Sequence, residues 1–195
     1  MSRHVVDGLT LPLPIGRHPV LDFCNTRAGW CTPEPYEYLG SYAHLVVWTR
    51  EAGLLAAGVA ESLRSADAES VLGRALALRD AIYAVCTGAR AEASWSVVAA
   101  EAERTAAARR LVRANGHGDW MLPVELGVDL PLRAIAGSAG ELVGSPGLEQ
   151  VRRCHGPDCG WLFLDPPGRR RWCEMAVCGN RAKARRHAAR RRFAG

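Results

Sequence analysis

Four cysteines lie close together near the end of the chain, and they constrain its fold more than any other feature. Cys154, Cys159, Cys173 and Cys178 follow the spacing C-x4-C-x13-C-x4-C. Zinc prefers a tetrahedron of thiolate or imidazole ligands, and two tight turns that each present two thiolates supply one. The sequence therefore predicts one zinc ion per chain. Because the protein fills all four positions, no bound water can be activated, and the ion is expected to be structural.

The other cysteines favour zinc over the alternative of two disulfides. The chain has seven cysteines, an odd number, and Cys24, Cys31 and Cys86 are scattered outside the cluster. In a reducing compartment, clustered cysteines more often hold a metal. We therefore expect these three not to be ligands. His155 is expected to lie beside the site without a coordination position.

Hydropathy at the start of the chain predicts a cytoplasmic protein that does not enter a membrane. No run of about 18 apolar residues occurs in the sequence. The N-terminal residues lack the apolar core of a signal peptide, since Pro12 and Pro14 interrupt their one apolar patch.

The cysteine-bearing segment predicts a small module that depends on its metal. Residues 161–164 are a strand candidate, and residues 166–168 are expected to turn the chain back. So few residues cannot hold a fold alone, whereas zinc binding supplies about 10–16 kcal/mol in finger peptides. The side chains expected to shield the ion are Trp161, Phe163, Trp172 and Met175.

Charge divides the chain into an acidic body and a basic end. Residues 1–151 hold 13 Arg against 17 acidic residues, a net −4, and residues 152–195 hold 12 cations against three acids, a net +9. Residues 179–193 read GNRAKARRHAARRRF, which predicts a helix whose like charges repel. Because phosphate would remove that repulsion, nucleic acid is the expected partner, with duplex DNA first. A solubilising tail is the alternative.

Cations on both sides of Cys173 are expected to contact the nucleic acid, because a zinc knuckle followed by a basic helix is a recurrent way to hold a helix against DNA. The predicted contacts are Arg169, Arg170, Arg171, Arg181, Lys183, Arg185, Arg186 and Arg190.

Apolar periodicity in the body predicts a mostly α fold with short β elements. An extended segment at 9–29 is expected to contain a buried strand at 20–24, and residues 115–130 to form a hairpin. Asp67 and Ser94 are candidate N-caps. The predicted helices cover residues 39–57, 66–90, 94–114 and 132–143. The predicted organisation is a helical N-terminal domain at 1–146 and, at 147–195, a small four-cysteine zinc module that ends in the basic helix.

Several side chains of the body receive structural interpretations. Trp48 is expected in the core, and Arg79 is expected to form an ion pair. A run of charges in the third helix is expected to face solvent for the most part, namely Glu101, Glu103, Arg104, Arg109 and Arg110.

Three motifs around the cysteines resemble the CGNR zinc finger: WLFLD at 161–165, RWCEM at 171–175 and CGNR at 178–181. Pro167 departs from that family, which usually has Ser or Thr there. Upstream, HPVLDFCNT at 18–26 is similar to the opening motif of the ABATE domain that precedes this finger. The resemblance implies a bacterial transcription regulator of the stress-induced kind, in which the body senses a signal and the finger binds nucleic acid.

Polar residues within that N-terminal motif allow two interpretations. Asp22, Asn25 and Thr26 could line a ligand pocket beside a buried strand. Alternatively, Asp22 pairs with an arginine while Asn25 and Thr26 cap a turn or helix, which is the interpretation we favour.

The sequence therefore predicts a DNA-binding regulator with a structural zinc ion. The alternatives are an RNA-binding protein and a zinc-stabilised protein-interaction module. An enzyme is not expected, since no phosphate-binding loop, metalloprotease motif or nucleophile motif is present. A homo-oligomer and a small-molecule effector are left open.

Overall fold

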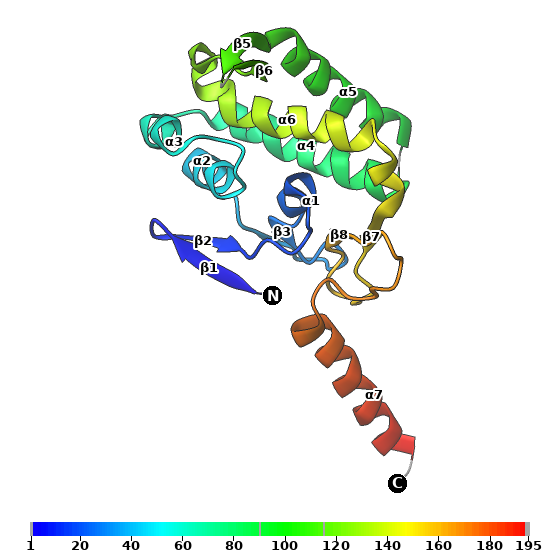
Figure 1. Ribbon diagram of the computed structural model, residues 1–195. Coiled ribbons are helices and arrows are strands. Elements are labelled where there is room, and N and C mark those ends of the chain that lie inside the picture. Colours follow the sequence, from blue (N-terminus) through cyan, green and yellow to red (C-terminus); the bar gives the residue numbers. More distant parts are fainter. Residues whose placement is uncertain (1, 90, 115, 194–195) are drawn as a thin grey trace. The chain divides into compact units, whose positions relative to one another are not determined.

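The computed structural model describes residues 2–89, 91–114 and 116–193, and its contacts divide the chain into two compact units. Residues 39–148 form the first, here called the helical unit. Residues 1–38 and 149–195 form the second, here called the cysteine unit. The predicted fold class, mostly α with short strands, is confirmed (Figure 1). The predicted boundary between two domains at residue 146 stays a prediction. The contacts within the chain group the first 38 residues with the cysteine-bearing end.

The helical unit is built on three helices that pack against one another, α4, α5 and α6 (Figure 1). Leu78, Ile82, Val98, Leu132 and Ile135 are buried along them. The predicted fourth helix is thus confirmed as α6. The elements of this unit are α2 (Tyr42–Glu51), α3 (Ala57–Leu63), α4 (Glu69–Thr87), α5 (Ala91–Ala108), β5 (Arg110–Ala114), β6 (His117–Met121), the 3₁₀ segment η1 (Val124–Asp129) and α6 (Leu130–Val143).

Some helices of this unit begin at a residue whose side chain caps them, and others begin without such a cap. The Ser41 hydroxyl accepts the His44 N–H at the start of α2. The helix predicted at 39–57 ends earlier than expected, at Glu51, and Gly53 follows it at φ 72°. Neither predicted N-cap is correct. Ala68 precedes α4 without a side-chain cap, and α5 begins before Ser94.

The predicted helix at 94–114 is wrong in its last part, which forms strand β5. Leu111 of β5 lies opposite Trp120 of β6 in an antiparallel hairpin. Cross-strand pairing of such side chains favours the extended conformation over the weak helical preference of Val112. The predicted hairpin is confirmed, although it begins earlier than expected, and Asn115 lies outside the described residues.

Glu101 is buried, so its predicted exposure is wrong. Its carboxylate oxygens lie 3.0 Å from the Arg74 guanidinium, 3.0 Å from Arg133 and 3.1 Å from Arg104. Three cations thus offset the cost of burying this charge. The rest of the charge run is confirmed: Glu103, Arg104 and Arg110 are exposed and Arg109 is half-buried. Trp48 is buried as predicted, and Arg79 is buried with its Nε 3.6 Å from the Asp80 carboxylate.

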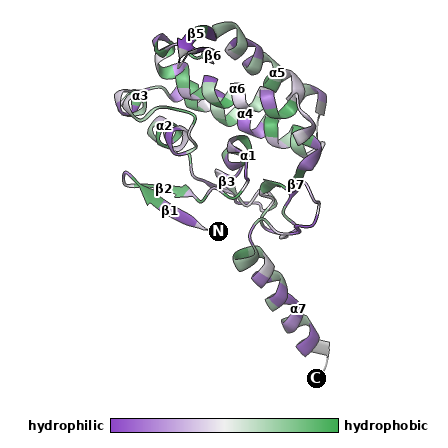
Figure 2. Ribbon diagram, in the orientation of Figure 1, coloured by the Kyte–Doolittle hydropathy of each residue, from purple (hydrophilic) through white to green (hydrophobic). Residues whose placement is uncertain are grey.

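The cysteine unit combines short elements from both ends of the chain. The predicted strand at 161–164 and the terminal helix are confirmed as β8 and α7. Most residues of α7 are hydrophilic (Figure 2). The elements are β1 (Arg3–Val6), β2 (Leu9–Pro12), α1 (Pro19–Cys24), β3 (Arg27–Ala28), β4 (Tyr36–Glu37), the 3₁₀ segment η2 (Pro146–Gln150) at its edge, β7 (Val151–Arg153), β8 (Leu162–Leu164), the π-helical turn η3 (Met175–Gly179) and α7 (Asn180–Phe193).

Two N-terminal elements differ from the prediction. The expected strand at 20–24 is helix α1, because His18 caps it through Nδ1 and Pro19 presets its first turn. The hairpin β1–β2 was missed, although Asp7-Gly8 at its tip, both at positive φ, is a typical hairpin signal. None of the described helices combines the length and the hydropathy that a membrane span requires.

Candidate metal centre

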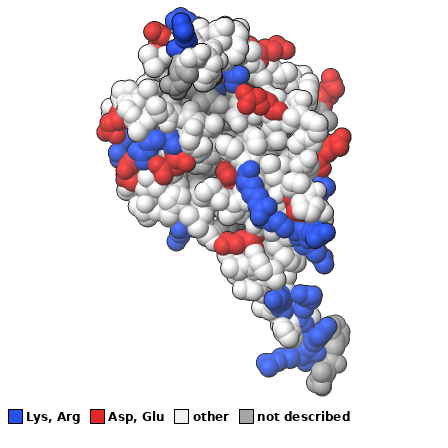
Figure 3. All heavy atoms as spheres, in the orientation of Figure 1, with Lys and Arg blue, Asp and Glu red and all other residues white. Residues whose placement is uncertain are grey.

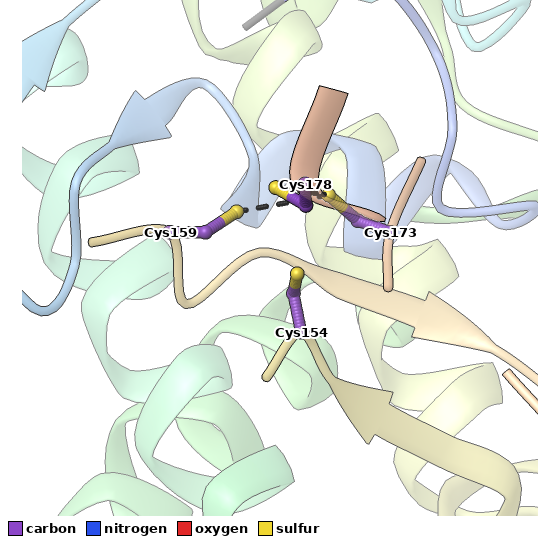
Figure 4. A group of neighbouring side chains, drawn as sticks. All are labelled: Cys154, Cys159, Cys173 and Cys178. Atoms are coloured by element: carbon purple, nitrogen blue, oxygen red, sulfur yellow. Dashed lines mark hydrogen bonds between the residues drawn. The ribbon is translucent and has the colours of Figure 1, made fainter. Parts of the chain in front are cut away.

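The sulfur atoms of the four predicted ligands lie close together in the structure. The sulfur atoms of Cys154, Cys159, Cys173 and Cys178 all lie within 4.8 Å of one another, and all four residues are buried (Figure 4). Cys173 Sγ lies 3.6 Å from both Cys159 Sγ and Cys178 Sγ. A tetrahedron with zinc–sulfur bonds of about 2.3 Å has edges of about 3.8 Å. The arrangement therefore fits one zinc ion held by four thiolates.

Backbone geometry places the first pair of sulfurs. Cys154 follows strand β7, and its N–H donates to Trp161 O at 2.8 Å. A tight turn follows, in which the Cys159 N–H donates to Gly156 O and the Gly156 N–H points at Cys154 Sγ from 3.4 Å. A Cβ on Gly156 would lie 3.1 Å from Cys159 Cβ and 3.4 Å from Cys178 Sγ. The turn therefore favours glycine at this position.

The close approach of the four thiols calls for a cation. The pKa values of the Cys159 and Cys173 thiols are raised above their usual range. The largest cause is hydrogen bonding with Cys154, and hydrogen bonding with Cys178 and burial add to it. Four buried thiolates at these distances would repel one another strongly. A divalent ion reverses that balance, because it binds the deprotonated sulfurs and neutralises them. With every ligand supplied by the chain, the ion has no open position for a substrate.

The shell around the sulfurs comes from both ends of the chain. Trp161 and Phe163 are buried against the cysteines as predicted, and Trp172 is partly buried. Met175 is 53% exposed, so its predicted shielding role is wrong. Sequence reasoning missed the N-terminal contribution, which consists of Ile15, Ala28, Trp30 and Tyr38.

Asn25 joins the N-terminal segment to the cysteine-bearing segment. Its side-chain amide donates to Leu162 O at 2.9 Å and accepts the Leu162 N–H at 2.8 Å, so it pairs with strand β8 as a peptide group would. The backbone of Gly16 accepts the Leu164 N–H at 2.8 Å. Asn25 is fully buried, and these bonds satisfy it.

Asp22 and Thr26 also bond within the chain. The Asp22 carboxylate accepts the N–H groups of Ile15 and Gly16 at 2.8 and 2.7 Å, and not an arginine as expected. Burial raises its pKa, and those two bonds partly oppose the rise. The Thr26 hydroxyl donates to Phe23 O at 2.6 Å. These contacts favour the structural interpretation of Asp22, Asn25 and Thr26, and ligand binding there stays a prediction.

The remaining candidates lie outside the sulfur cluster. Among the described residues, the group of potential metal ligands contains only the four cysteines. Cys24 is buried and Cys31 is exposed. Cys86 is partly buried, and burial raises the pKa of its thiol to about 12. His155 is exposed, with its ring edge-on to Trp172 at 6.1 Å.

Two family models match the chain, in the order that the motifs suggested. Residues 17–146 match the ABATE model, described as "Putative stress-induced transcription regulator", and residues 150–191 match the CGNR zinc finger. The chain belongs to the ABATE family. A comparison with curated proteins found no match. The ABATE match supports a regulator, and the CGNR match assigns the sulfur cluster to a structural zinc ion.

Two of the cations predicted to contact nucleic acid in this ABATE protein form a hydrogen bond or an ion pair within the described part of the chain. Arg170 lies over the Phe163 ring at 4.3 Å, and its guanidinium donates to Cys173 O at 2.6 Å. Arg185 pairs with Asp158 at 2.6 Å. Asn180 donates to Ala176 O at 2.9 Å, which is a supporting role at the start of α7.

The other six side chains predicted to contact nucleic acid form no ion pair with the described residues. Lys and Arg side chains cluster along α7 (Figure 3). The six side chains are Arg169, Arg171, Arg181, Lys183, Arg186 and Arg190. Their contact with nucleic acid stays a prediction.

Proposed function

We propose that this protein is a transcription regulator whose CGNR finger holds helix α7 against duplex DNA. The observation that carries the proposal is the surface of α7. Its sequence, NRAKARRHAARRRF, contains seven cations and no acid, and residues 183–191 are exposed throughout. Lys183, Arg186 and Arg190 follow the spacing i, i+3, i+7, which places them on one face. They line a shared hollow with His187.

The start of α7 is attached to the predicted zinc site. Cys178 lies in η3, which runs directly into α7, and the Cys178 N–H donates to Glu174 O at 3.0 Å. A helix of like charges is weakly stable alone, and phosphates neutralise it and release counterions. A solubilising tail would not require attachment to a metal ligand. Attachment therefore supports a docking role over the solubilising alternative.

We assign signal reception to the helical unit, in keeping with the stress-induced description of its family. We also propose that the protein is not an enzyme, because four protein ligands leave the ion no catalytic position. RNA binding and a protein-interaction module are the alternatives that the experiment must separate from DNA binding.

Fluorescence anisotropy at several salt concentrations tests the proposal on the full-length, zinc-loaded protein. Arg186→Ala/Arg190→Ala removes two exposed cations of α7, and the matched control Arg110→Ala/Arg113→Ala removes two exposed cations of the helical unit. Each phosphate contact contributes about −0.9 to the slope of log K against log salt on duplex DNA. We expect the first pair to flatten that slope by about 2 and the control pair to leave it unchanged.

Structured RNA is titrated alongside the duplex. Equal effects of the two pairs, or no binding to duplex DNA at low salt, would overturn the DNA proposal. Tighter binding to RNA with the same α7 dependence would establish the RNA alternative instead.

A further inference from the structure

The cysteine unit contains an open hollow of about 470 Å³ that the zinc site does not use. This volume lies in the usual range for small-ligand sites. Both segments of the unit line it, the N-terminal one through Arg3, Glu34, Tyr36 and Tyr38 and the cysteine-bearing one through Asp158 and Arg181.

Tyr36 gives the hollow a fixed aromatic surface. It lies on β4 opposite Ala28 of β3, and its ring stands edge-on to Tyr38 at 4.8 Å. Tyr38 is buried, and its N–H donates to Thr26 O at 3.0 Å. Tyr36 itself is 54% exposed. A ring that is held by its backbone and open to solvent is a suitable platform for stacking of a planar base.

Charges around the ring suit the other parts of a nucleotide. Arg3 and Arg181 form no ion pair with any described residue, so their guanidiniums are available to a phosphate. The carboxylate of Asp158 also lines the hollow, and Arg185 pairs with it at 2.6 Å and offsets part of its charge. Glu34 likewise has no cationic partner among the described residues. Its carboxylate can accept two N–H groups side by side, which the imino and amino groups of guanine present.

We propose that this hollow binds one unpaired nucleotide, with the base stacked on Tyr36, the phosphate at Arg3 and Arg181, and guanine preferred through Glu34. A base within a duplex cannot enter, because its edge is paired and its faces are stacked. The ligand is either an unpaired residue of a nucleic acid or a free nucleotide. The first source rests on the function proposed above, and Arg181 supports it, since it also begins the cationic surface of α7.

Two titrations of the full-length, zinc-loaded protein test the hollow. One compares a blunt duplex with the same duplex carrying a single unpaired guanine, and the other uses free GMP, AMP and CMP. We expect the unpaired guanine to strengthen binding about tenfold, since stacking of one base on an aromatic ring contributes roughly that much or more. GMP should bind more tightly than AMP or CMP.

Variants assign the effect to individual side chains. Tyr36→Ala should abolish the gain from the unpaired guanine and leave blunt-duplex binding within about twofold, whereas Tyr36→Phe should keep the gain. Glu34→Gln should remove the preference for guanine. Trp120→Ala, which removes an exposed ring of the helical unit, is the matched control and should change nothing. Zinc content, measured for every variant, confirms that the cysteine unit is folded.

The outcomes separate this inference from the proposed function. Duplex binding that depends on α7, without any Tyr36-dependent gain and without GMP binding, would overturn the hollow and leave the function standing. Tyr36-dependent GMP binding by a protein that binds no nucleic acid would support the hollow as a free-nucleotide site and overturn the function.

Discussion

The two units of this chain are stabilised by different means. The helical unit buries long apolar faces of α4, α5 and α6 against one another. The cysteine unit has strands of two to four residues, and α1 spans only six. Its core is a shell of aromatic side chains around four cysteines. A core of that size is too small to offset the entropy of ordering its loops, so the metal must supply the difference.

The segment that holds the metal also bonds to a part of the chain that is distant in sequence. Asn25 bonds to Leu162, Gly16 to Leu164, and the Trp30 N–H to Cys159 O at 3.2 Å. Each of these contacts spans more than 100 residues of chain, so it carries a large loop-closure cost. The N-terminal segment should therefore depend on zinc as strongly as the cysteines do. Three predictions test this contrast, in order of decreasing effect.

Zinc removal should produce the largest effect, and it should be confined to the cysteine unit. Elemental analysis should find one zinc per chain. Chelation, or Cys173→Ser, removes a contribution of about 10–16 kcal/mol. Hydrogen exchange should then show loss of protection at residues 151–179 and also at residues 9–38, while α4 and α6 stay protected. Cys31→Ser, at an exposed cysteine outside the cluster, is the control and should retain zinc. Protection of the N-terminal segment in the metal-free protein would refute the dependence.

Glu101→Gln should give the largest single-residue effect within the helical unit. The substitution removes the carboxylate that lies 3.0 Å from the largely buried Arg133, which keeps only the more distant Asp129 at 3.8 Å. Breaking a buried ion pair costs about 3–5 kcal/mol, and we expect the low end because Arg74 and Arg104 are partly exposed. Urea denaturation followed by far-UV circular dichroism measures the loss. Glu103→Gln, at an exposed carboxylate on the same helix, should change stability by less than about 0.5 kcal/mol. Zinc content should be normal in both variants, and loss of zinc in Glu101→Gln would show that the two units are not independent.

The same contrast explains which features could be predicted from the sequence. The zinc ligands and α7 were predictable because their signals are local, namely a cysteine spacing and a run of cations without proline. The burial of Glu101 could not be predicted, because its partners Arg74 and Arg133 lie on α4 and α6 and only tertiary packing brings these helices together. Helix α1 was missed because residues 20–24, apolar except for Asp22, are too few for their pattern to distinguish a buried strand from a buried helix.

The docking of the N-terminal segment on the zinc module had no local signal either. Trp30 and Tyr38 lie in a stretch without periodicity, and nothing in their spacing identifies their partners. The motif at 18–26 marked the segment as unusual. Its structural role follows from the pairing of Asn25 with β8, which joins residues far apart in the sequence.

Asn25→Ala should give the smallest of the three effects, and it tests whether that pairing holds the cysteine unit together. The substitution leaves the buried N–H and C=O of Leu162 without partners, and each unsatisfied group costs about 1–3 kcal/mol. We expect the zinc-saturated unit to lose roughly 2–4 kcal/mol, measured as earlier thermal loss of near-UV circular dichroism from its tryptophans. Asn180→Ala, at an exposed asparagine of the same unit with one local bond, should cost only a few tenths of a kcal/mol. Because the Asn25 side chain bonds to the backbone of Leu162 and is not one of the four ligands, zinc should still bind one per chain, and weaker zinc binding would follow from the lost folding energy. If Asn25→Ala were as stable as Asn180→Ala, the N-terminal segment would be held by the aromatic shell and not by this pair of hydrogen bonds.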